Sequence, residues 1–278
     1  MVEIGIIGQG FVGNSVREGL KGFFQIHTFD LIKEKSNVTN IQELFKKSDV
    51  IFVCLPTPMK SSGECATKIV DSVLTELNGY GKKTIILKST VPPGTCEALS
   101  NKHTNLNIVF NPEFLTEANA VNDFINQDRI ILGGNSTEAL DSVEELFRVA
   151  FNNVPIIKTD TKTAEMVKYI TNCFLATKVS FANNIYDICK LSGIDYNNAI
   201  DIAKLDKRLG DSHWMVPGPD GDRGYGGHCF PKDMGALVYH ASTIGYYPHV
   251  IATAIEVNNT VRSDRNWEDM HGRAVSDE

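Results

Sequence analysis

A glycine-rich motif near the amino end constrains the fold of this chain more than any other feature. It lies between residues 2–7, an apolar and β-branched run, and residues 14–20, which follow a helix-like pattern. The motif, Gly8-Gln9-Gly10-Phe11-Val12-Gly13, is a G-x-G-x-x-G sequence in the strand–turn–helix setting that it requires. Gly8 makes the tight turn, Gly10 permits close approach to a pyrophosphate, and Gly13 permits close helix–strand packing. The N-terminus of the helix would offer free N–H groups to the phosphates, and Phe11 and Val12 are expected among the cofactor contacts.

An acidic residue completes the motif. A second predicted strand, residues 25–29, ends at Asp30. A carboxylate at this position can bind a ribose 2′-hydroxyl and would repel a 2′-phosphate. We therefore predict a dinucleotide-binding domain that uses NAD rather than NADP.

The first half of the chain alternates strand and helix patterns, which is typical of a doubly wound parallel sheet. Further strands are predicted at residues 49–55, 84–88, 107–110, 129–132 and 154–157, with helices at 41–47, 70–77 and 137–150. We expect an α/β fold in which residues 1–158 form a Rossmann-like NAD-binding domain. A helical central domain should follow at residues 159–278.

From about Thr161 the pattern becomes helical and stays so without a proline until Gly193. This predicts one long helix of roughly 30 residues, beyond the usual globular range. Such a helix most simply joins two domains and packs against a copy of itself, so we predict a homodimer. A kinked pair of ordinary helices is the alternative. The remainder is expected to be helical apart from a loop at residues 210–227.

Composition excludes several classes of partner. The formal net charge is −7 and no basic cluster is visible, which argues against nucleic acid and anionic membranes. No apolar stretch approaches the roughly 20 residues of a membrane helix, and the amino end enters a strand at once, so no secretory signal is expected. The 6 cysteines have no metal-binding or disulfide spacing. We expect no metal site and a cytoplasmic protein with free thiols.

A segment late in the chain contains the residue types that covalent thiol chemistry needs. It is Gly224-Tyr225-Gly226-Gly227-His228-Cys229-Phe230-Pro231-Lys232-Asp233. Glycines just before Cys229 allow a bound molecule to reach the sulfur. Lys232 favours the thiolate, and Asp233 can hold a water or take its proton. The alternative is a glycine turn that opens a helix, with Cys229 as a small buried hydrophobic residue.

Further polar residues follow the predicted strands at the edge where such sheets bind ligands. They lie in segments 56–58, 89–94 and 111–117, each of which could also be a proline turn with a helix cap. Glu113 and Glu117 are four residues apart and could share one helical face. Lys168 and Asn172 have the same spacing on the long helix and could stabilise one developing oxyanion. Their alternative is a solvated lysine beside an ordinary asparagine.

Taken in order, these motifs resemble the UDP-glucose/GDP-mannose dehydrogenase family over nearly the whole chain. The matching segments are residues 8–13, Asp30, 56–58, 88–95, 111–115, Lys168 with Asn172, and 224–233. The resemblance implies a four-electron oxidation at C6 of a nucleotide-linked hexose, with two NAD consumed and a Cys229 thiohemiacetal and thioester as intermediates.

The resemblance also implies roles for individual residues. Lys168 and Asn172 would stabilise oxyanions, and Asp233, Thr90 and Glu117 would position a water and move protons. NAD contacts would include Thr57, Pro58, Thr90 and Glu117 besides the glycine motif and Asp30. Substrate contacts would come from Glu113, Phe114, Leu115, Lys168, Asn172, Tyr225, Gly226 and Lys232.

Two departures from the family and two other functions remain open. The family usually has a third domain, and this chain stops near the end of the linker to it; a natural short form, a truncated form or a partner that supplies the missing part would each explain this. Asn183-Asn184 stands where the family usually has Asn-Glu.

β-Hydroxyacid dehydrogenases also place a lysine and an asparagine four apart on a long helix, but they oxidise once and need no cysteine. A non-catalytic NAD-binding protein is the other alternative.

Overall fold

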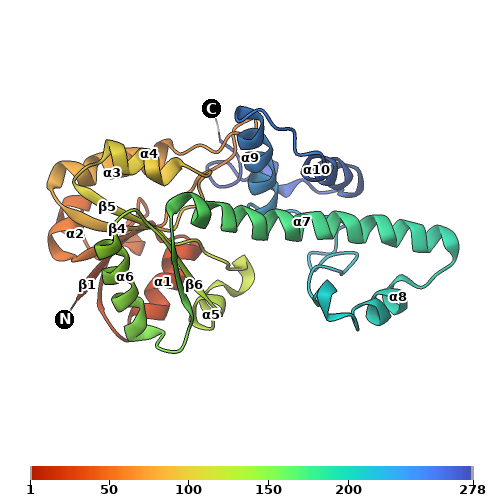
Figure 1. The fold of residues 1–278 in the computed structure, drawn as a ribbon, viewed down its shortest axis with the longest axis horizontal. Helices are drawn as coiled ribbons and strands as arrows, with labels where there is room; N and C mark the ends of the chain where they lie inside the picture. The colour runs from red at the N-terminus through yellow and green to blue at the C-terminus, as the bar shows by residue number, and fades with distance from the viewer. Residues whose placement is uncertain (1, 277–278) are drawn as a thin grey trace. The chain divides into compact units, whose positions relative to one another are not determined.

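The computed structural model describes residues 2–276, which form a seven-stranded sheet and ten α-helices (Figure 1). The strands are β1 (Glu3–Ile7), β2 (Gln25–Phe29), β3 (Val50–Val53), β4 (Lys83–Leu87), β5 (Leu106–Phe110), β6 (Ile130–Gly133) and β7 (Ile156–Thr159). The α-helices are α1 (Phe11–Leu20), α2 (Ile41–Lys47), α3 (Lys68–Tyr80), α4 (Thr95–Lys102), α5 (Ala120–Ile125), α6 (Thr137–Ala150), α7 (Thr161–Ser192), α8 (Tyr196–Ala203), α9 (Phe230–Thr243) and α10 (His249–Val261). Four short 3-10 helices are η1 (Lys33–Lys35), η2 (Glu117–Asn119), η3 (Lys207–Leu209) and η4 (Asn266–Asp269).

The sheet has the order β2-β1-β3-β4-β5-β6-β7, and the strand pairs are parallel with one exception. Strands β5 and β6 are antiparallel. The prediction of a doubly wound parallel sheet is confirmed, with this pair as the one antiparallel exception. Parallel neighbours need a crossover that returns the chain to the opposite end of the sheet. Residues 111–129, with η2 and α5, instead leave and re-enter the sheet at the same end, so β6 runs antiparallel to β5.

Helices cover both faces of the sheet, because the buried strands point apolar side chains to either side. On one face, α2, α3, α4 and the beginning of α7 share a core with residues such as Ile51, Ile85 and Ile108. On the other face, α1, α5 and α6 pack on residues such as Phe52 and Ile86. These three layers form the scaffold that holds the glycine motif at the end of β1.

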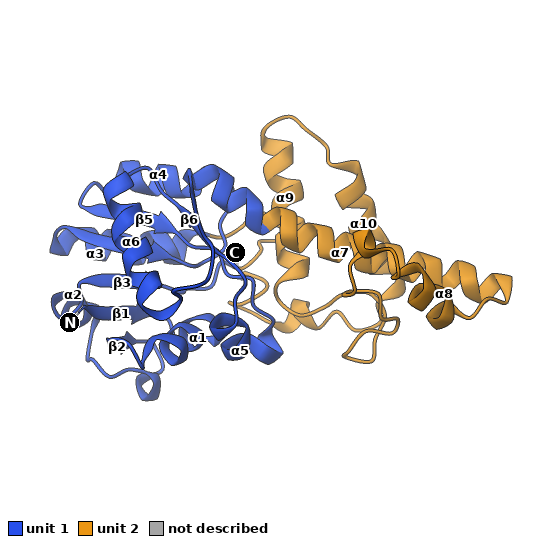
Figure 2. Cartoon of the chain, turned by 60° about the horizontal axis from the view of Figure 1, so that its bottom comes forward, with its two compact units in different colours: residues 1–57, 67–168 blue, residues 58–66, 169–278 orange. Residues whose placement is uncertain are grey.

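The chain divides into two compact units (Figure 2). Unit 1 consists of Met1–Thr57 and Thr67–Lys168 and contains the whole sheet. Unit 2 consists of Pro58–Ala66 and Tyr169–Glu278. Unit 1 thus continues through the first two turns of α7, beyond the boundary expected after residue 158, and a short segment after β3 belongs to unit 2.

Helix α7 is one continuous helix of 32 residues, so the prediction of a long helix is confirmed and the kinked pair is excluded. In unit 2 its far part packs with α8 and the following loop around Cys189, Tyr196 and Trp214. The segment 58–66 joins unit 2 by backbone hydrogen bonds, because Met59 N–H donates to Ala274 and Ser276 N–H donates to Met59, each at 2.8 Å.

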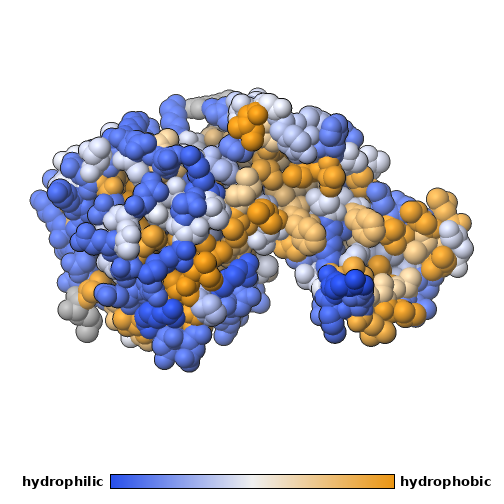
Figure 3. Space-filling view, in the orientation of Figure 1, coloured by the Kyte–Doolittle hydropathy of each residue, from blue (hydrophilic) through white to orange (hydrophobic). Residues whose placement is uncertain are grey.

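Apolar side chains remain exposed along α7 within unit 2, and Figure 3 shows apolar surface gathered there. Phe174, Phe181 and Ile188 are exposed and stand seven residues apart, so they lie on one side of the helix. No helix within residues 2–276 combines the length and the apolar character needed to cross a membrane.

Candidate active site

The glycine turn after β1 has the geometry expected for dinucleotide binding. Gly8 has a φ of +89°, a left-handed conformation that favours glycine. A Cβ atom on Gly13 would lie 1.8 Å from the carbonyl oxygen of Gly8, so no larger residue fits there. A Cβ on Gly10 would meet nothing within 4 Å. The turn is therefore closed by packing at Gly8 and Gly13 and open at Gly10.

This open position fits the diphosphate of a dinucleotide. Gly10 is the N-cap of α1 and provides no side-chain cap, and the first turn of α1 has no acidic residue. No acidic side chain of the first turn therefore competes with a bound anion for the positive end of the helix dipole. Phe11 and Val12 form the start of α1, which begins before the predicted helical range of residues 14–20.

Asp30 lies at the end of β2, beside the turn. Its carboxylate accepts hydrogen bonds from the backbone N–H of Gln9 at 2.6 Å and of Ile32 at 2.8 Å. The carboxylate thus fixes the glycine turn from the neighbouring strand. This is the position that the ribose of a dinucleotide requires in the fingerprint.

The ends of β3 and β4 are tied together in unit 1. Thr57 Oγ1 donates to the carbonyl of Thr90 at 2.7 Å, and both residues are buried. The Ser89 hydroxyl accepts from Leu55 N–H at 2.9 Å. The structure therefore brings together the two predicted residues Thr57 and Thr90, which are 33 positions apart in the chain.

Lys168 is buried against Glu113 rather than exposed to solvent. Its Nζ lies 2.9 Å from Glu113 Oε1 and donates to the Glu113 carbonyl at 2.6 Å. The other carboxylate oxygen of Glu113 accepts from Leu115 N–H at 2.8 Å. The interpretation of Lys168 as an ordinary solvated lysine is therefore excluded.

The prediction that Glu113 and Glu117 share a helical face is wrong. Residues 111–116 form an irregular segment, and Glu117 is exposed at the start of η2. The segment is shaped instead by individual hydrogen bonds, because the Thr116 N–H and hydroxyl both donate to Asp123, at 2.7 and 2.6 Å.

A small pocket of about 50 Å³ opens beside this segment. Phe114 lines it, with the Arg129 guanidinium carbon 4.4 Å and Lys168 Nζ 5.6 Å from the centre of its ring. Leu115, Glu113 and the buried Lys88 also line this pocket. Three of the predicted substrate contacts therefore share one wall in unit 1.

In unit 2, Cys229 is half-buried and forms the N-cap of α9. Its Sγ lies 3.3 Å from Nε2 of His228, which is itself buried. A cysteine at a helix N-terminus beside a basic side chain is a setting that favours the thiolate. The interpretation of Cys229 as an inert core residue does not fit this setting.

Asp233 lies one turn further along α9 and is almost completely buried. Asn172 Nδ2 donates to its Oδ2 at 2.6 Å, and Lys232 pairs with its Oδ1. Burial alone would lower the pKa of Lys232, but the charge of Asp233, with smaller contributions from Cys65 and Cys229, raises it above the ordinary value. Asn172, Lys232 and Asp233 thus form one buried cluster.

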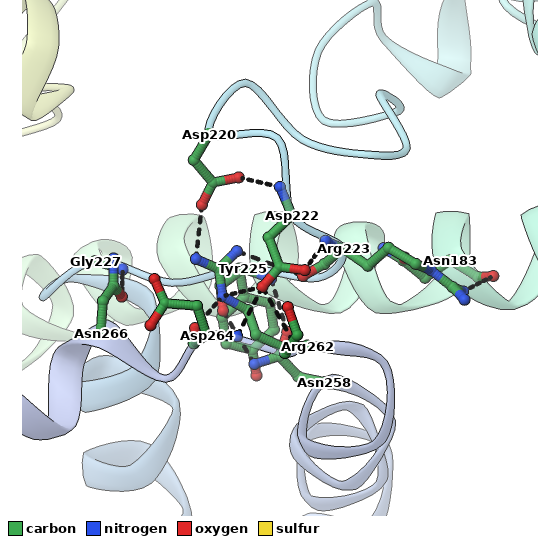
Figure 4. A network of polar contacts seen from close by, with 11 residues as sticks. Asn183, Asp220, Asp222, Arg223, Tyr225, Gly227, Asn258, Arg262, Asp264 and Asn266 are labelled. Atoms are coloured by element: carbon green, nitrogen blue, oxygen red, sulfur yellow. Dashed lines mark hydrogen bonds and ion pairs between the residues drawn. The ribbon is translucent and has the colours of Figure 1, made fainter.

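The loop before Cys229 is fastened by side chains at the end of α10 and just beyond (Figure 4). The Asn258 amide bonds both backbone groups of Tyr225, accepting from its N–H at 2.7 Å and donating to its carbonyl at 3.0 Å. Gly227 N–H donates to Asn266 at 3.0 Å. A Cβ on Gly226 would lie 2.4 Å from the buried Arg262. Tyr225 and Gly226 therefore owe their positions to α10 and the residues after it.

Sequence reasoning missed three buried groups. Lys88 donates to Asn111 Oδ1 at 2.7 Å, and burial lowers its pKa to about 8. Glu165 accepts from the N–H groups of Gly94 and Cys96 at the start of α4, and burial raises its pKa. His228 contacts the sulfur of Cys229. Only His228, adjacent to the cysteine, had a local signal that could have revealed it.

Within residues 2–276 no group of three or more His, Cys, Asp or Glu side chains is placed to hold a metal ion. The predicted residues fall into two sets. Unit 1 holds the glycine turn, Asp30, Thr57, Thr90, Glu117, and Lys168 with the segment 113–115. Unit 2 holds Pro58, Asn172, Tyr225, Gly226, Cys229, Lys232 and Asp233.

Comparison with models of protein families shows to which family the chain belongs. Residues 28–151 match the NAD binding domain of the UDP-glucose/GDP-mannose dehydrogenase family, and residues 162–260 match its central domain. The chain belongs to this family. Its first domain is thus an NAD-binding domain of the UDP-glucose/GDP-mannose dehydrogenases.

The curated UDP-glucose 6-dehydrogenase TuaD of Bacillus subtilis (strain 168) is 33% identical to this chain. The match covers 94% of this chain, which spans 64% of the length of that relative.

Two solved structures have the same fold. A UDP-glucose dehydrogenase from Pyrobaculum islandicum superposes with a TM-score of 0.81 at 24% identity, over 94% of this chain and 68% of that one. The 3-hydroxyisobutyrate dehydrogenase of Mycobacterium tuberculosis superposes with a TM-score of 0.77 at 15% identity, over 94% and 93%. The fold alone therefore does not separate the family from the hydroxyacid dehydrogenases.

Proposed function

We propose that this protein oxidises the C6 alcohol of a nucleotide sugar to a carboxylate with two NAD, with UDP-glucose as the substrate and UDP-glucuronate as the product. The observation that carries the proposal is the arrangement in unit 2. Cys229 stands at the N-terminus of α9, and Asp233, one turn on, is held by Asn172 and Lys232. A simple alcohol dehydrogenase has no use for such a thiol.

Cys229 is the nucleophile that makes the second oxidation accessible. The first oxidation removes a hydride and a proton from the C6 alcohol and leaves an aldehyde. The sulfur then bonds to the aldehyde carbon, and the carbonyl oxygen takes up a proton, which gives a thiohemiacetal. When bound, NAD supplies the hydride acceptor for each oxidation.

The second oxidation removes a hydride from this carbon and a proton from its hydroxyl, and a thioester remains on Cys229. Water attacks the thioester carbon, the carbon–sulfur bond breaks, and the carboxylate leaves with the thiol restored. Asp233 positions this water or accepts its proton. Its contacts with Lys232 and Asn172 hold the carboxylate in a fixed orientation for that role.

Lys168 and Asn172 stabilise the oxygen that becomes negatively charged in these steps. Lysine has three N–H donors, and Glu113 occupies two of those of Lys168. One donor remains for an oxyanion. Asn172 uses one amide N–H on Asp233 and has a second one. Thr90 and Glu117 assist in positioning water and moving protons, and Thr57, Pro58 and Asp30 contribute to NAD binding.

Substrate contacts come from Glu113, Phe114, Leu115, Tyr225, Gly226 and Lys232. Since Lys232 is buried and paired with Asp233, it acts on the substrate mainly through its positive charge. We place the protein in the cytoplasm, without nucleic acid or membrane as a partner. We propose that it forms a homodimer through the exposed apolar side of α7, at Phe174, Phe181 and Ile188.

The test is to supply UDP-glucose, UDP-N-acetylmannosamine or GDP-mannose with NAD and to count the NADH formed per sugar consumed. We expect two NADH per UDP-glucose and a nucleotide-linked acid as product. One NADH per substrate would favour the hydroxyacid type of reaction. NAD binding without turnover on any of the three would favour a binding protein. The Cys229→Ser variant should form no acid.

A further inference from the structure

The residue before the proposed nucleophile contacts the reacting atom directly. His228 Nε2 lies 3.3 Å from Cys229 Sγ, within the range of a hydrogen bond to sulfur. The imidazole is buried, so water competes little for this contact. Histidine is the side chain whose ordinary pKa allows it to exchange a proton near neutral pH.

The backbone around the pair is held in place, so the contact does not depend on a mobile loop. Gly227 has a φ of +70° and its N–H donates to Asn266 at 3.0 Å. Two residues earlier, the Asn258 amide fixes Tyr225. On the other side, α9 begins at Phe230. His228 and Cys229 thus form the last turn between a fastened loop and a helix.

The other charges near the pair are largely committed to partners. On α9, Lys232 and Asp233 pair with each other. At the end of α10, Arg262 is bound to Asp220 at 2.6 Å. From neighbouring elements, the thiol of Cys65 in segment 58–66 acts on Lys232, and Cys173 on α7 donates to the Asp233 carbonyl at 3.6 Å. The His213 ring lies 5.8 Å from the ring of Phe230, the residue after Cys229. The positive charge of Lys232 favours the Cys229 thiolate. Lys232 cannot accept the thiol proton itself, because its side chain is an ammonium group paired with Asp233.

We propose that His228 is a catalytic residue that accepts the proton of the Cys229 thiol, so that the thiolate forms before it attacks the aldehyde. This inference rests on the proposed function. The S–H bond breaks, an N–H bond forms at Nε2, and the sulfur keeps the electron pair with which it bonds to the aldehyde carbon. The role requires the neutral imidazole with its proton on Nδ1.

The same group serves the end of the cycle. When water hydrolyses the thioester, the sulfur leaves as a thiolate, and the imidazolium beside it stabilises this leaving group. The proton taken from the thiol at the start returns to the sulfur at the end, so the residue is regenerated in each cycle. Lys168 and Asn172 act on the oxygen, whereas His228 acts on the sulfur.

The inference is tested without turnover, by the pH dependence of Cys229 alkylation with iodoacetamide in the wild type, His228→Ser and His228→Gln. Mass spectrometry of the peptide that contains Cys229 separates its modification from that of the other cysteines. The midpoint of the profile is the readout, because a thiol of lower pKa is also a weaker nucleophile once ionised. His240→Ser, on α9, is the matched control.

We expect a wild-type midpoint well below the roughly 8.5 of a free thiol, and a shift up toward that value in both His228 variants. Glutamine preserves a hydrogen bond but cannot accept the proton. An unchanged midpoint in a folded His228→Ser protein would overturn the inference, as would a His228→Gln profile identical to that of the wild type. A wild-type midpoint of about 8.5 or above overturns it even if the variants do not fold.

This measurement separates the inference from the proposed function. The alkylation profile contains no sugar and no NAD, so it reports on the His228–Cys229 pair alone. NADH counting reports on the reaction. A shifted profile without acid formation would refute the proposed reaction but support the role of His228. Acid formation with an unshifted profile would support the reaction and refute the role of His228.

Discussion

At the scale of single residues, Lys168, Lys232 and Asp233 are buried charged groups, and each has a defined partner. Lys168 is paired with Glu113, 55 positions away, and Asn172 with Asp233, 61 positions away. A buried charge without a partner would be far costlier than a buried ion pair. The sequence could indicate which residues carry chemistry, but not these partners, since pairing across such distances is decided by tertiary packing.

Lys88 gives a prediction at this scale. Burial lowers its pKa to about 8, whereas a lysine in an unfolded chain has a pKa of about 10.4. Between these two values the unfolded chain binds more protons than the folded one, so this group makes the free energy of unfolding rise with pH. From pH 7 to pH 10, we expect the wild type to gain about 2 kcal/mol relative to Lys88→Gln.

Urea unfolding of both proteins at these two pH values measures the difference. Glutamine can still donate to Asn111, so the comparison isolates the charge. If the difference in the free energy of unfolding between the wild type and Lys88→Gln is the same at both pH values, Lys88 is charged in the folded protein at pH 10.

At the scale of elements, the local pattern around β1, α1 and β2 was sufficient to predict the dinucleotide turn. The glycine roles follow from steric constraints that the sequence expresses directly, and the bounds of β2, α2 and α6 agree with the predicted ranges. The direction of β6 and the irregular course of residues 111–116 could not be predicted in this way. Periodicity indicates strand or helix, but neither the direction of a strand nor the hydrogen bonds between Thr116 and Asp123.

The glycine turn yields a matched pair of variants. Gly10→Ala places a methyl group in open space, at a φ of −70° that alanine adopts readily, so stability should stay unchanged. The methyl group would occupy the diphosphate position, and NAD affinity should fall on the order of tenfold, or about 1.4 kcal/mol. Gly13→Ala should instead destabilise the fold by about 1–3 kcal/mol or more, because its Cβ overlaps the Gly8 carbonyl.

Calorimetric NAD titration and thermal unfolding of both variants check this pair. Full NAD affinity in Gly10→Ala would show that the diphosphate does not bind at this turn.

The loop that precedes Cys229 gives a second prediction at this scale. Asn258→Ala removes both partners of the buried Tyr225 backbone, and each group left unpaired costs about 1–3 kcal/mol. We expect unit 2 to lose about 2 kcal/mol or more of stability, with faster hydrogen exchange at residues 225–227. The neighbouring Asn259, which is exposed, is the control, and its alanine variant should behave as the wild type. Unaltered exchange in Asn258→Ala would mean that other contacts hold the loop.

At the scale of the whole molecule, the sequence predicted a nucleotide-binding unit, a long helix and a helical unit, and these predictions are confirmed by the fold. It placed the change of domain where the helix begins. The compact unit 1 continues to Lys168, because the first turns of α7 pack on the sheet through Ala164 and fasten α4 through Glu165. A boundary inside a helix leaves no trace in the helical periodicity.

The exposed apolar side of α7 makes the proposed dimer testable. Phe181 and Ile188 are 54% and 57% exposed. Contact of these two large apolar side chains with water is unfavourable unless another surface covers them. The double variant Phe181→Glu and Ile188→Glu should be a monomer by sedimentation, while the wild type is a dimer. Lys190→Glu, on the opposite side of α7, should remain a dimer. A monomeric wild type at micromolar concentration would contradict the proposal.

The central claim is that the sugar becomes covalently attached to Cys229. The most direct measurement is mass spectrometry of Asp233→Asn after mixing with NAD and UDP-glucose and quenching in acid, because loss of the carboxylate should slow hydrolysis of the thioester. We predict a UDP-glucuronyl thioester on the peptide that contains Cys229, absent when NAD is omitted. An unmodified Cys229 in a protein that still reduces NAD with UDP-glucose would contradict the account.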